Sequence, residues 1–449
     1  VKSIHAATLS ADYLAQLSYV YRRLEMPVEA LQAAEASLAK QVTSNAQEQY
    51  VLALMLNGDY PRAEAYVQAH QLNQSNLLFT VKLQQLSQKI LNAVQFYQSS
   101  SYRNEGEKAF YPLDAVLAEM KALSAELPEQ ADLQRRFYYE YIDALNQRNR
   151  SKEVLLVAQQ LNMNPQEMPA YVRHAIADAY LKLQQPAKAE PLYLSLFKEK
   201  NSVDYSVYAG LYYAYIEQEK FKQANQLFQE MDKTLPTFRY SDAKGVEPTT
   251  HPDRLGYLSL KGLNYAYRNQ HAKAEQYFQN LVEHAPSNVA FQNNLALIQR
   301  WREKPLDAEH TVSQWNGMTP ISQTTQINQM QNAQTLGDIE RWRAINHYLY
   351  QTVPDDTAVQ RSRKELNDRE HFSIQHSSTW SESKSDQQLL NQLKGSNEQN
   401  HWTRLNSPWM NDYYRLFADH AYRWSKYQEG KIDDQRVGLG LEWNKQRKA

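Results

Sequence analysis

A short sequence pattern recurs along the chain at intervals near 34 residues, and it constrains the fold more than any other feature. Six stretches end on an alanine that begins an apolar-periodic run: LEMPVEA, NGDYPRA, LQQPAKA, EQEKFKQA, RNQHAKA and WREKPLDA. These alanines lie 33, 126, 35, 50 and 34 residues apart. A repeat of this length is typical of one helix pair that stacks on its neighbours. The six alanines are Ala30, Ala63, Ala189, Ala224, Ala274 and Ala308.

Aromatic residues and prolines keep the same period. Two antiparallel helices approach closely only where a small side chain lies at the crossing, aromatic rings fill the groove between pairs, and proline ends a helix. The chain therefore resembles the tetratricopeptide repeat family over residues 10–320, most clearly over 171–320, and we predict an α-solenoid of such helix pairs. The residues in step are Tyr180, Tyr215, Tyr265, Tyr193, Phe228, Phe278, Pro236, Pro286 and Pro320, with Val154 in a weaker copy of the motif.

The spacing departs from this period in two places. The step from Ala224 to Ala274 is one repeat plus 16 residues, and the excess falls at 237–254, which is rich in Pro, Asp and Thr. We predict an insertion loop there. Residues 64–153 keep helical spacing without the repeat signature, so we predict two or three irregular helix pairs.

The helical pattern continues to Glu370. A unit at 337–356 repeats the plan with Ala344, Tyr348 and Pro354, and a charged segment follows it. We predict a last helix pair in this unit and one final charged helix before residue 371.

After Glu370 the helical period gives way to alternation between polar and apolar residues. We predict strands at about 372–380, 413–426 and 435–444. In the second of these, one face is largely apolar with aromatic rings at both ends, and the other face carries charge. Its length meets the roughly 9–11 residues that a tilted transmembrane strand needs, and such aromatic ends suit the two membrane interfaces.

The connections between these strands predict an orientation. A polar segment at 381–411 separates the first two strands, whereas only QEGKIDD, 428–434, separates the second and third. Outer-membrane barrels have long extracellular loops and short periplasmic turns. We therefore predict that the long segment is outside, and that the short turn and the helical stack are in the periplasm.

Three strands have open edges that hydrocarbon cannot satisfy, and a membrane barrel needs at least about eight strands. We therefore expect residues 1–370 to form a periplasmic superhelix and 371–449 to be only the start of a β-barrel within a longer gene product. From the alternation alone, a small soluble sheet that caps the solenoid is an equal alternative.

Composition excludes several classes of function. The 49 Lys and Arg against 50 Asp and Glu give a net charge of −1, so the basic field that nucleic acids require is absent. The absence of cysteine excludes disulfides, zinc thiolates and a cysteine nucleophile. No apolar run approaches about 18 residues, so no transmembrane helix is predicted.

The last repeats carry a more specific resemblance. The segment LVEHAPSNVAFQNNLALIQRWREKPLDAEHTVSQWNGMTP, followed by GDIERWRAINHYLYQTVPDD and HFSIQHSSTW, is similar to the outer-membrane porin family that exports the biofilm polysaccharide poly-β-1,6-N-acetyl-D-glucosamine. This resemblance covers 260–449, and upstream it depends on repeat architecture alone. The residues that carry it are Ala285, Pro286, Asn288, Arg300, Trp301, Arg302, Ala308 and Pro320.

The resemblance implies a route for the polymer. A periplasmic deacetylase lipoprotein would dock on the repeats, and the partly de-N-acetylated polymer would leave through the barrel in the outer membrane. Deacetylation makes this polymer cationic, so carboxylates and flat aromatic rings suit its path. The charged strand residues expected to face the lumen are Arg415, Asp419, Arg423, Arg436 and Glu442, with the arginines pairing with the carboxylates.

Four residues on the inner face of first helices are the candidate contacts for polymer or partner: Tyr171, His174, Asp178 and Tyr213. The alternative for all four is plain exposed helix surface. We predict that Tyr180, Tyr215 and Tyr265 serve packing rather than binding.

Catalytic and cofactor motifs are missing from the sequence. It has no Gly-x-Ser-x-Gly elbow, no His-Glu-x-x-His and no phosphate-binding loop, so we predict neither an enzyme nor a cofactor or metal site. His371 and His376 could ligate a metal, but hydrogen-bonded histidines are the better interpretation. Asp355, Asp356, Asp433 and Asp434 are paired carboxylates in predicted turns, where acids are ordinary solvated residues.

Two alternatives to this function remain open. The first is a soluble repeat adaptor that recognises a peptide or protein and has no membrane role. The second is an exporter of another polysaccharide, such as cellulose or alginate. Membrane fractionation distinguishes a soluble adaptor from an exporter. Binding to neutral, cationic and anionic glycans distinguishes an exporter of another polysaccharide from the exporter predicted above.

Overall fold

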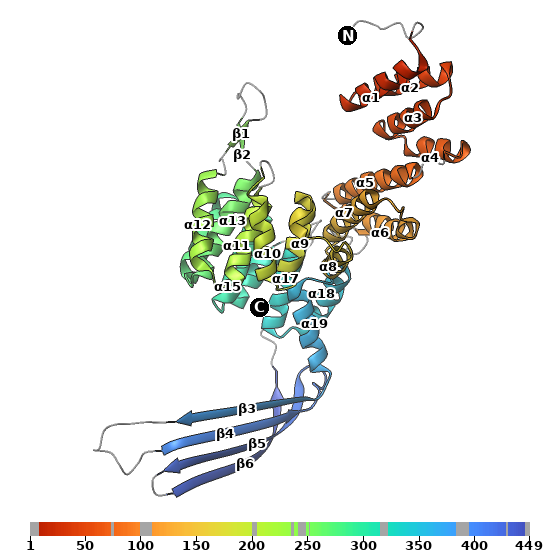
Figure 1. Ribbon diagram of the computed structural model, residues 1–449. Coiled ribbons are helices and arrows are strands. Elements are labelled where there is room, and N and C mark those ends of the chain that lie inside the picture. Colours follow the sequence, from red (N-terminus) through yellow and green to blue (C-terminus); the bar gives the residue numbers. More distant parts are fainter. Residues whose placement is uncertain are drawn as a thin grey trace. The chain divides into compact units, whose positions relative to one another are not determined.

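The computed structural model describes residues 9–72, 76–98, 110–199, 204–234, 238–240, 248–250, 252–314, 322–382, 395–427 and 430–444 (Figure 1). The chain divides into two compact units, Val1–Leu227 and Phe228–Ala449, and the boundary falls within helix α12. Each unit is described by itself below.

The first unit consists of consecutive antiparallel helices. Their order follows the chain, and neighbours in sequence pack together from α1 to α11. They are α1 (Ala11–Arg23), α2 (Pro27–Lys40), α3 (Ser44–Leu56), α4 (Tyr60–Ala69), α5 (Leu77–Gln98), α6 (Tyr111–Leu123), α7 (Ala131–Gln147), α8 (Ser151–Gln160), α9 (Ala170–Lys182), α10 (Pro186–Leu196), α11 (Tyr205–Glu217) and α12 (Phe221–Thr234). Between residues 64 and 153, where the repeat signature is weak, α5 packs on α6 and α7 packs on α8.

The second unit continues the same plan and ends in a sheet. Its helices are α13 (Pro252–Tyr267), α14 (His271–His284), α15 (Val289–Trp301), α16 (Pro305–Ser313), α17 (Gln323–Leu336), α18 (Ile339–Thr352) and α19 (Thr357–Arg369). First helices contact the first helix of the next pair, as in α13 with α15 and α15 with α17. Within this unit, the first helices therefore form one continuous surface.

The small residues that mark each repeat lie at the helix crossings, as the sequence predicted. All six marker alanines and Val154 are fully buried. Gly210 and Gly262 supply a second point of close approach, because the rings of Tyr193 and Phe278 fill the space that a Cβ would need. The α-solenoid of helix pairs is thus confirmed.

The turns within pairs explain why the short motifs resemble one another. In each of the eight pairs α1–α2, α3–α4, α7–α8, α9–α10, α11–α12, α13–α14, α15–α16 and α17–α18, one turn residue has left-handed backbone geometry. Asn and Gly tolerate this geometry best, and a chain reversal of so few residues requires it. These turn residues are Glu25, Gly58, Asn149, Gln184, Glu219, Asn269, Glu303 and Gly337.

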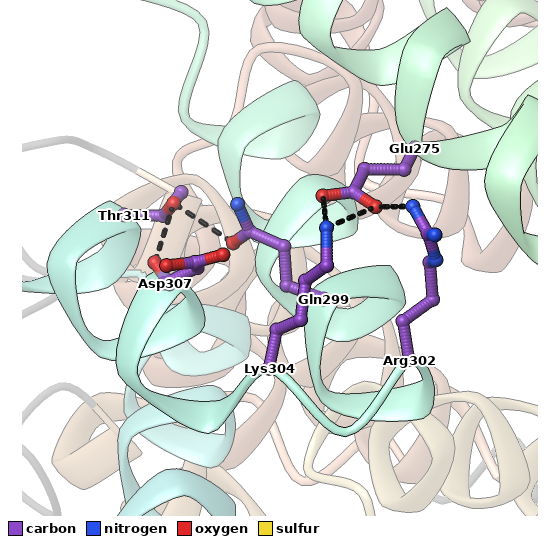
Figure 2. Close-up of polar contacts among 6 residues, drawn as sticks. All are labelled: Glu275, Gln299, Arg302, Lys304, Asp307 and Thr311. Carbon is purple, nitrogen blue, oxygen red and sulfur yellow. Dashed lines mark hydrogen bonds and ion pairs between the residues drawn. The ribbon is translucent and has the colours of Figure 1, made fainter.

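Ion pairs link successive repeats at the same position. The carboxylate that follows the marker alanine pairs with a cation about one repeat later: Glu190 with Lys220 at 2.5 Å, and Glu309 with Arg341 at 2.5 Å. Figure 2 shows the third case, in which Glu275 accepts hydrogen bonds from Arg302 and Lys304. We call these three carboxylates, Glu190, Glu275 and Glu309, the ladder acids.

Figure 2 also shows a hydrogen bond between side chains of α15 and α16, the helices on either side of this turn. The Thr311 hydroxyl donates to Gln299 Oε1 at 2.9 Å and to the main-chain carbonyl of Asp307 at 3.0 Å. Gln299 and Thr311 are both buried, so these bonds satisfy polar groups that would otherwise be costly to bury.

Two sequence predictions within the helical region need correction. The insertion at 237–254 is not entirely loop, because β1 (Phe238–Tyr240) pairs antiparallel with β2 (Pro248–Thr250) and α13 begins at Pro252. In the unit at 337–356, the packing position is Trp342 rather than Ala344, which is exposed. Trp342 is buried and donates its indole N–H to Ser362 Oγ at 2.6 Å, so a large ring replaces the usual small residue. Pro236 and Pro320 lie outside the described residues.

A four-stranded antiparallel sheet follows α19 directly, in the order β3-β4-β5-β6. The strands are β3 (Ser373–Glu382), β4 (Gly395–Asn406), β5 (Tyr414–Tyr427) and β6 (Gly430–Trp443). The sequence analysis missed β4, which lies in the polar segment assigned to one long loop. Backbone bonds to strands on both sides hold β4, and most of its pairs with β3 are polar, as in His376 with Thr403 at 2.8 Å. Apolar alternation therefore could not reveal it.

Because β4 is an additional strand, one predicted connection lies at the opposite end of the sheet from the end that was predicted. Asn406 pairs with Ser373 at the start of β3, so the β4–β5 connection lies at the end of the sheet nearest α19. Trp409 N–H donates to the Arg369 carbonyl at 2.8 Å and confirms this placement. The turn after β5 lies at the opposite end, because Tyr427 pairs with Gly430. The prediction that this turn and the helical stack share one side is wrong.

Candidate polymer and partner surfaces

Three of the four predicted contact residues lie on α9, and two of them, His174 and Asp178, belong to one polar cluster. His174 Nε2 lies 3.6 Å from Asp178 Oδ1 and 3.5 Å from Ser206 Oγ of α11. Asp178 also accepts a hydrogen bond of 2.6 Å from the hydroxyl of Tyr193, whose ring is fully buried. Burial, followed by the charge of Asp178, raises the pKa of Tyr193 above its ordinary value. Asp178 therefore supports the packing of Tyr193 as much as it offers a charge to a ligand.

Asp204 fixes the start of α11 beside this cluster. Its carboxylate accepts hydrogen bonds from Ser206 Oγ at 2.5 Å and from Val207 N–H at 3.1 Å, as an N-cap. Burial alone would raise the pKa of Asp204, but these hydrogen bonds and the nearby His174 hold it below the ordinary value. The sequence analysis missed Asp204 and Ser206, although an aspartate directly before an apolar-periodic run is a signal for a helix N-terminus.

Tyr171 is the exposed member of the predicted set. Its ring is 44% exposed, and its hydroxyl lies 3.4 Å from Glu140 Oε1 of α7. Burial of the hydroxyl end and the neighbouring Glu140 raise its pKa. Tyr213 is half-buried, and burial raises its pKa to about 12. Of the four candidates, Tyr171 therefore offers the largest aromatic surface to a ligand.

The three tyrosines assigned to packing are engaged within their own repeats. Tyr215 is buried. Lys188 lies over the Tyr180 ring at 5.4 Å, and Lys273 lies over the Tyr265 ring at 4.3 Å. These contacts are consistent with the packing role predicted from their spacing.

The sheet has one polar face, and all five predicted strand residues lie on it. The register places Arg415 opposite Glu442, and Ala421 opposite Arg436. Residues directly opposite one another point to the same face of the sheet. Odd-numbered residues of β5 therefore share a face with even-numbered residues of β6. Glu442 accepts from Arg415 at 2.8 Å and from Arg404 of β4 at 2.9 Å. Arg423 pairs with Glu398 at 2.6 Å. Most charges on this face are thus neutralised across strands.

Asp419 is the exception on the polar face. It lies opposite Arg404 and Gly438 in the register, but no hydrogen bond or ion pair joins it to another described residue. Gly438 leaves the space that the Asp419 carboxylate occupies, and Gly440 leaves space for the Phe417 ring. The two glycines of β6 therefore accommodate side chains from β5, and Asp419 keeps an unpaired carboxylate available.

The sequence analysis missed the contributions of β4 to this face. Arg404, Glu398 and Trp402 all lie on it, and the Arg404 guanidinium lies 3.6 Å from the centroid of the Phe417 ring. Charged residues at even-numbered positions of β4 could have indicated this face. The residues between them are also polar, so the sequence showed no clear alternation.

The other face of the sheet carries large exposed apolar side chains, beside a polar band that includes His376, His401 and His420. Leu439 is 84% exposed and Val437 is 77% exposed. Large exposed apolar patches in soluble proteins are uncommon and mark contact with a partner or a membrane. We call this set the apolar face: Ile374, Leu405, Leu416, Val437, Leu439 and Leu441, bordered by the rings of Trp380, Tyr414 and Trp443.

The two histidines considered as metal ligands both make hydrogen bonds. His371 Nδ1 lies 2.8 Å from the Asn367 carbonyl, and His376 Nδ1 lies 2.8 Å from Thr403 Oγ1. Among the described residues, no three His, Asp or Glu side chains gather as a metal site would require. Within the same residues, every helix is too short or too polar to cross a bilayer.

Comparison with known proteins finds two curated relatives. The chain is 25% identical over 352 residues to the poly-beta-1,6-N-acetyl-D-glucosamine export protein of Escherichia coli K12, and equally to that of Escherichia coli O157:H7. The alignment covers 76% of this chain and 42% of each relative. The chain thus spans less than half the length of the curated relatives it matches. No family model matches it.

Solved structures of helical repeat proteins give weak similarity. A tetratricopeptide repeat protein from Parabacteroides merdae is 13% identical, with a TM-score of 0.41, and the match covers 64% of this chain and 99% of that one. Human IFIT1 is also 13% identical, with a TM-score of 0.38, covering 80% of this chain and 81% of the other. The fold assignment depends on the helix pairs described above.

Proposed function

We propose that this chain takes part in the export of poly-β-1,6-N-acetyl-D-glucosamine across the bacterial outer membrane. In this proposal the helical repeats lie in the periplasm, and β3 to β6 belong to a transmembrane β-barrel. The role is binding and transport, with no chemical step. The similarity to export proteins over three quarters of the chain supports it.

The observation that carries the proposal is the two-faced sheet that follows the repeats. α19 ends at Arg369 and β3 begins at Ser373. The apolar face is exposed, whereas the opposite face carries ion pairs and an unpaired carboxylate. An apolar outer surface with a polar inner surface is the arrangement that barrel strands need in a membrane.

The polymer would meet two kinds of surface along this route. We propose that a periplasmic deacetylase docks on the repeats and that Tyr171 contacts the sugar chain through its exposed ring. Free amines on the polymer would then pass the polar face, where Asp419 lies without a cation of its own. An ammonium group paired with a carboxylate gains more in a narrow, poorly solvated channel than in water.

The location is tested by a charge on the apolar face. Leu439→Arg in the full-length protein is expected to lower the amount recovered in the outer membrane, since arginine near the bilayer midplane costs about 2–4 kcal/mol. Ile432→Arg is the matched control, because Ile432 is also exposed on β6 but lies on the polar face. Surface polymer and heat-modifiable gel migration are measured together. Normal assembly of Leu439→Arg, or recovery of the wild type in the soluble fraction, contradicts the proposal.

Binding by the repeats is tested at Tyr171. Tyr171→Ala is expected to weaken binding to partly deacetylated glucosamine oligomers or to the deacetylase about tenfold, a loss typical of one aromatic contact. Tyr13→Ala is the matched control, because Tyr13 is 50% exposed on α1. Equal loss in both variants would show that Tyr171 has no special role.

The class of polymer is tested with charged glycans. Neutral and cationic oligomers are expected to bind, and binding of the cationic oligomer is expected to weaken with salt. A preference for an anionic glycan such as alginate oligomers would replace this substrate with another.

A further inference from the structure

The direct link between the last helix and the sheet is short and loosely packed. α19 ends at Arg369 and β3 begins at Ser373, so only residues 370–372 join them in sequence. Within the described part of the chain, α19 packs on α17 and α18 but has no packing of that extent on a strand. A cavity of about 510 Å³ lies here, lined in part by Asp368 of α19 and Gln375 of β3. A single short link beside such a cavity would leave the sheet free to pivot.

A second attachment joins the sheet to the helices. It is the β4–β5 connection, residues 407–413. Each end of this connection is bonded to the sheet. Ser407 N–H donates to the Leu416 carbonyl at 2.9 Å, and Asn444 N–H donates to the Tyr413 carbonyl at 2.9 Å. The connection is therefore part of the same rigid hydrogen-bonded network as the strands.

This connection also satisfies the end of α19. The last carbonyls of a helix have no partner within the helix, and Trp409 N–H donates to one of them, the Arg369 carbonyl, at 2.8 Å. In return, the Arg369 guanidinium donates to the main-chain carbonyl of Asp412. Asn411 and Asp412 have left-handed backbone geometry, with φ of 49° and 64°, which Asn and Asp tolerate better than most residues. A tight turn thus brings the Asp412 carbonyl to the helix.

The ring of Trp409 joins a cation of the helix to a cation of the sheet. The guanidinium of Arg369 lies 4.5 Å from the ring centroid, and that of Arg415 on β5 lies 4.6 Å from it. Arg415 is in turn held by Glu442 of β6 at 2.8 Å. Trp409 is half-buried, and cation–π contacts strengthen as water is excluded from them. The ring therefore contributes an attachment that does not depend on the backbone bonds.

The ion pairs at this joint are its weaker part. Arg343 of α18 pairs with Asp412 at 2.8 Å and also with Glu370. The exposed fractions of these three side chains lie between 34% and 54%, and ion pairs so open to water contribute little. The joint therefore depends on the half-buried Trp409 ring more than on Arg343.

We infer that Trp409 is a positioning residue, and that the β4–β5 connection holds α18 and α19 at a constant angle to the sheet. Two attachments on different strands remove the freedom that one short link would leave. The joint rests on these contacts alone, whereas its use in export rests on the proposed function. In that use, a polymer that follows the first helices of this unit reaches the polar face of the sheet in one fixed geometry.

Pulsed electron paramagnetic resonance tests the joint in the full-length protein in detergent. The chain has no cysteine, so labelled cysteines can replace Ala344, exposed on α18, and Arg436, exposed on β6. A narrow distance distribution is expected. Trp409→Ala is expected to broaden it at least about twofold, because parts that share only a small interface move relative to one another by default. Trp409→Phe keeps an aromatic face for both arginines and is expected to restore most of the narrow distribution.

Two further variants serve as controls. Trp402→Ala is the matched control, because Trp402 lies within β4, opposite Ala421, rather than in the connection. Asp412→Asn removes the ion pair with Arg343 but keeps the turn and its carbonyl, so only slight broadening is expected. Circular dichroism and heat-modifiable gel migration show whether each variant is folded.

Three results would overturn the inference: a wild-type distribution as broad as that of Trp409→Ala, an unchanged distribution in Trp409→Ala, or equal broadening in Trp402→Ala. Surface polymer on cells tests the use of the joint. Trp409→Ala is expected to lower it while the amount of protein in the outer membrane stays normal, and normal surface polymer with a broadened distribution would overturn that use. Recovery of the wild type in the soluble fraction would contradict the proposed function, while the distance measurement still decides whether the joint exists.

Discussion

The helical repeats and the sheet both hold a carboxylate between two cations, and the surroundings of the two differ. Glu275 of the repeats lies between Arg302 and Lys304, and its side chain is 5% exposed. Glu442 of the sheet lies between Arg404 and Arg415, and it is 35% exposed. In the repeats, apolar side chains are buried and ion pairs join neighbours. In the sheet, the large apolar side chains are the exposed ones. The repeats complete their own core, whereas the sheet requires an apolar environment from elsewhere.

Loss of Glu275 is expected to have the largest effect on folding. Glu275→Ala leaves two partly buried cations without their partner, so we expect the free energy of unfolding to fall by about 3 kcal/mol. Chemical denaturation measures this change, with Glu283→Ala on the exposed side of the same helix as the control. A loss below about 1 kcal/mol would show that the ladder acids do not hold the repeats together.

Replacing one glycine in each region by alanine tests how tightly that region is packed. Gly262→Ala forces a Cβ against Phe278, which is fully buried and cannot move, so a loss of about 2 kcal/mol is expected. Gly440→Ala forces a Cβ against Phe417, which is only half-buried. The ring can turn away, and we expect a loss below about 1 kcal/mol. Equal losses in denaturation experiments would contradict the difference in packing.

Glu442→Gln is expected to have a smaller effect than the loss of Glu275. The glutamine keeps a hydrogen-bond acceptor, and the site is more open to solvent, so we expect a loss of about 1 kcal/mol. Unfolding of the full-length protein in detergent provides the measurement. If Glu442→Gln destabilises as much as Glu275→Ala, the two carboxylates are equivalent and the comparison fails.

Loss of the N-cap of α11 is expected to have the smallest effect on the free energy of unfolding, and this effect depends on pH. Asp204→Ala is expected to cost about 1 kcal/mol at neutral pH. The pKa of Asp204 is lowered in the folded state, so its contribution is present above the unfolded aspartate pKa and is lost as pH falls through the lowered value. Asp204→Asn keeps the cap without the titration. A stability difference that grows on acidification would contradict the assignment.

The sequence predicted the repeats well because their physical cause is local. A small residue at each helix crossing, and a turn residue that tolerates left-handed geometry, recur in the sequence itself. The acid that follows the marker alanine also recurs, at Glu190, Glu275 and Glu309, and this signal could have predicted the ladder. Ala344 was wrongly assigned to the packing position, because the bulky ring of Trp342 fills the place where the pattern expects alanine.

The remaining features depend on contacts between distant segments. β4 carries polar residues on both faces, with Trp402 and Leu405 as its large apolar side chains, so only its pairing with β3 and β5 reveals it as a strand. The five charged strand residues were correctly assigned to one face, since alternation alone determines parity.

Spin labels on the sheet test the central claim most directly. The chain has no cysteine, so single labelled cysteines can be placed at Leu439 and at Arg436, which lie on opposite faces of β6. In the full-length protein in outer-membrane vesicles, we expect the label at 439 to be accessible to dissolved oxygen and the label at 436 to a water-soluble nickel chelate. Accessibility of both labels to nickel alone would contradict the claim that the apolar face contacts hydrocarbon.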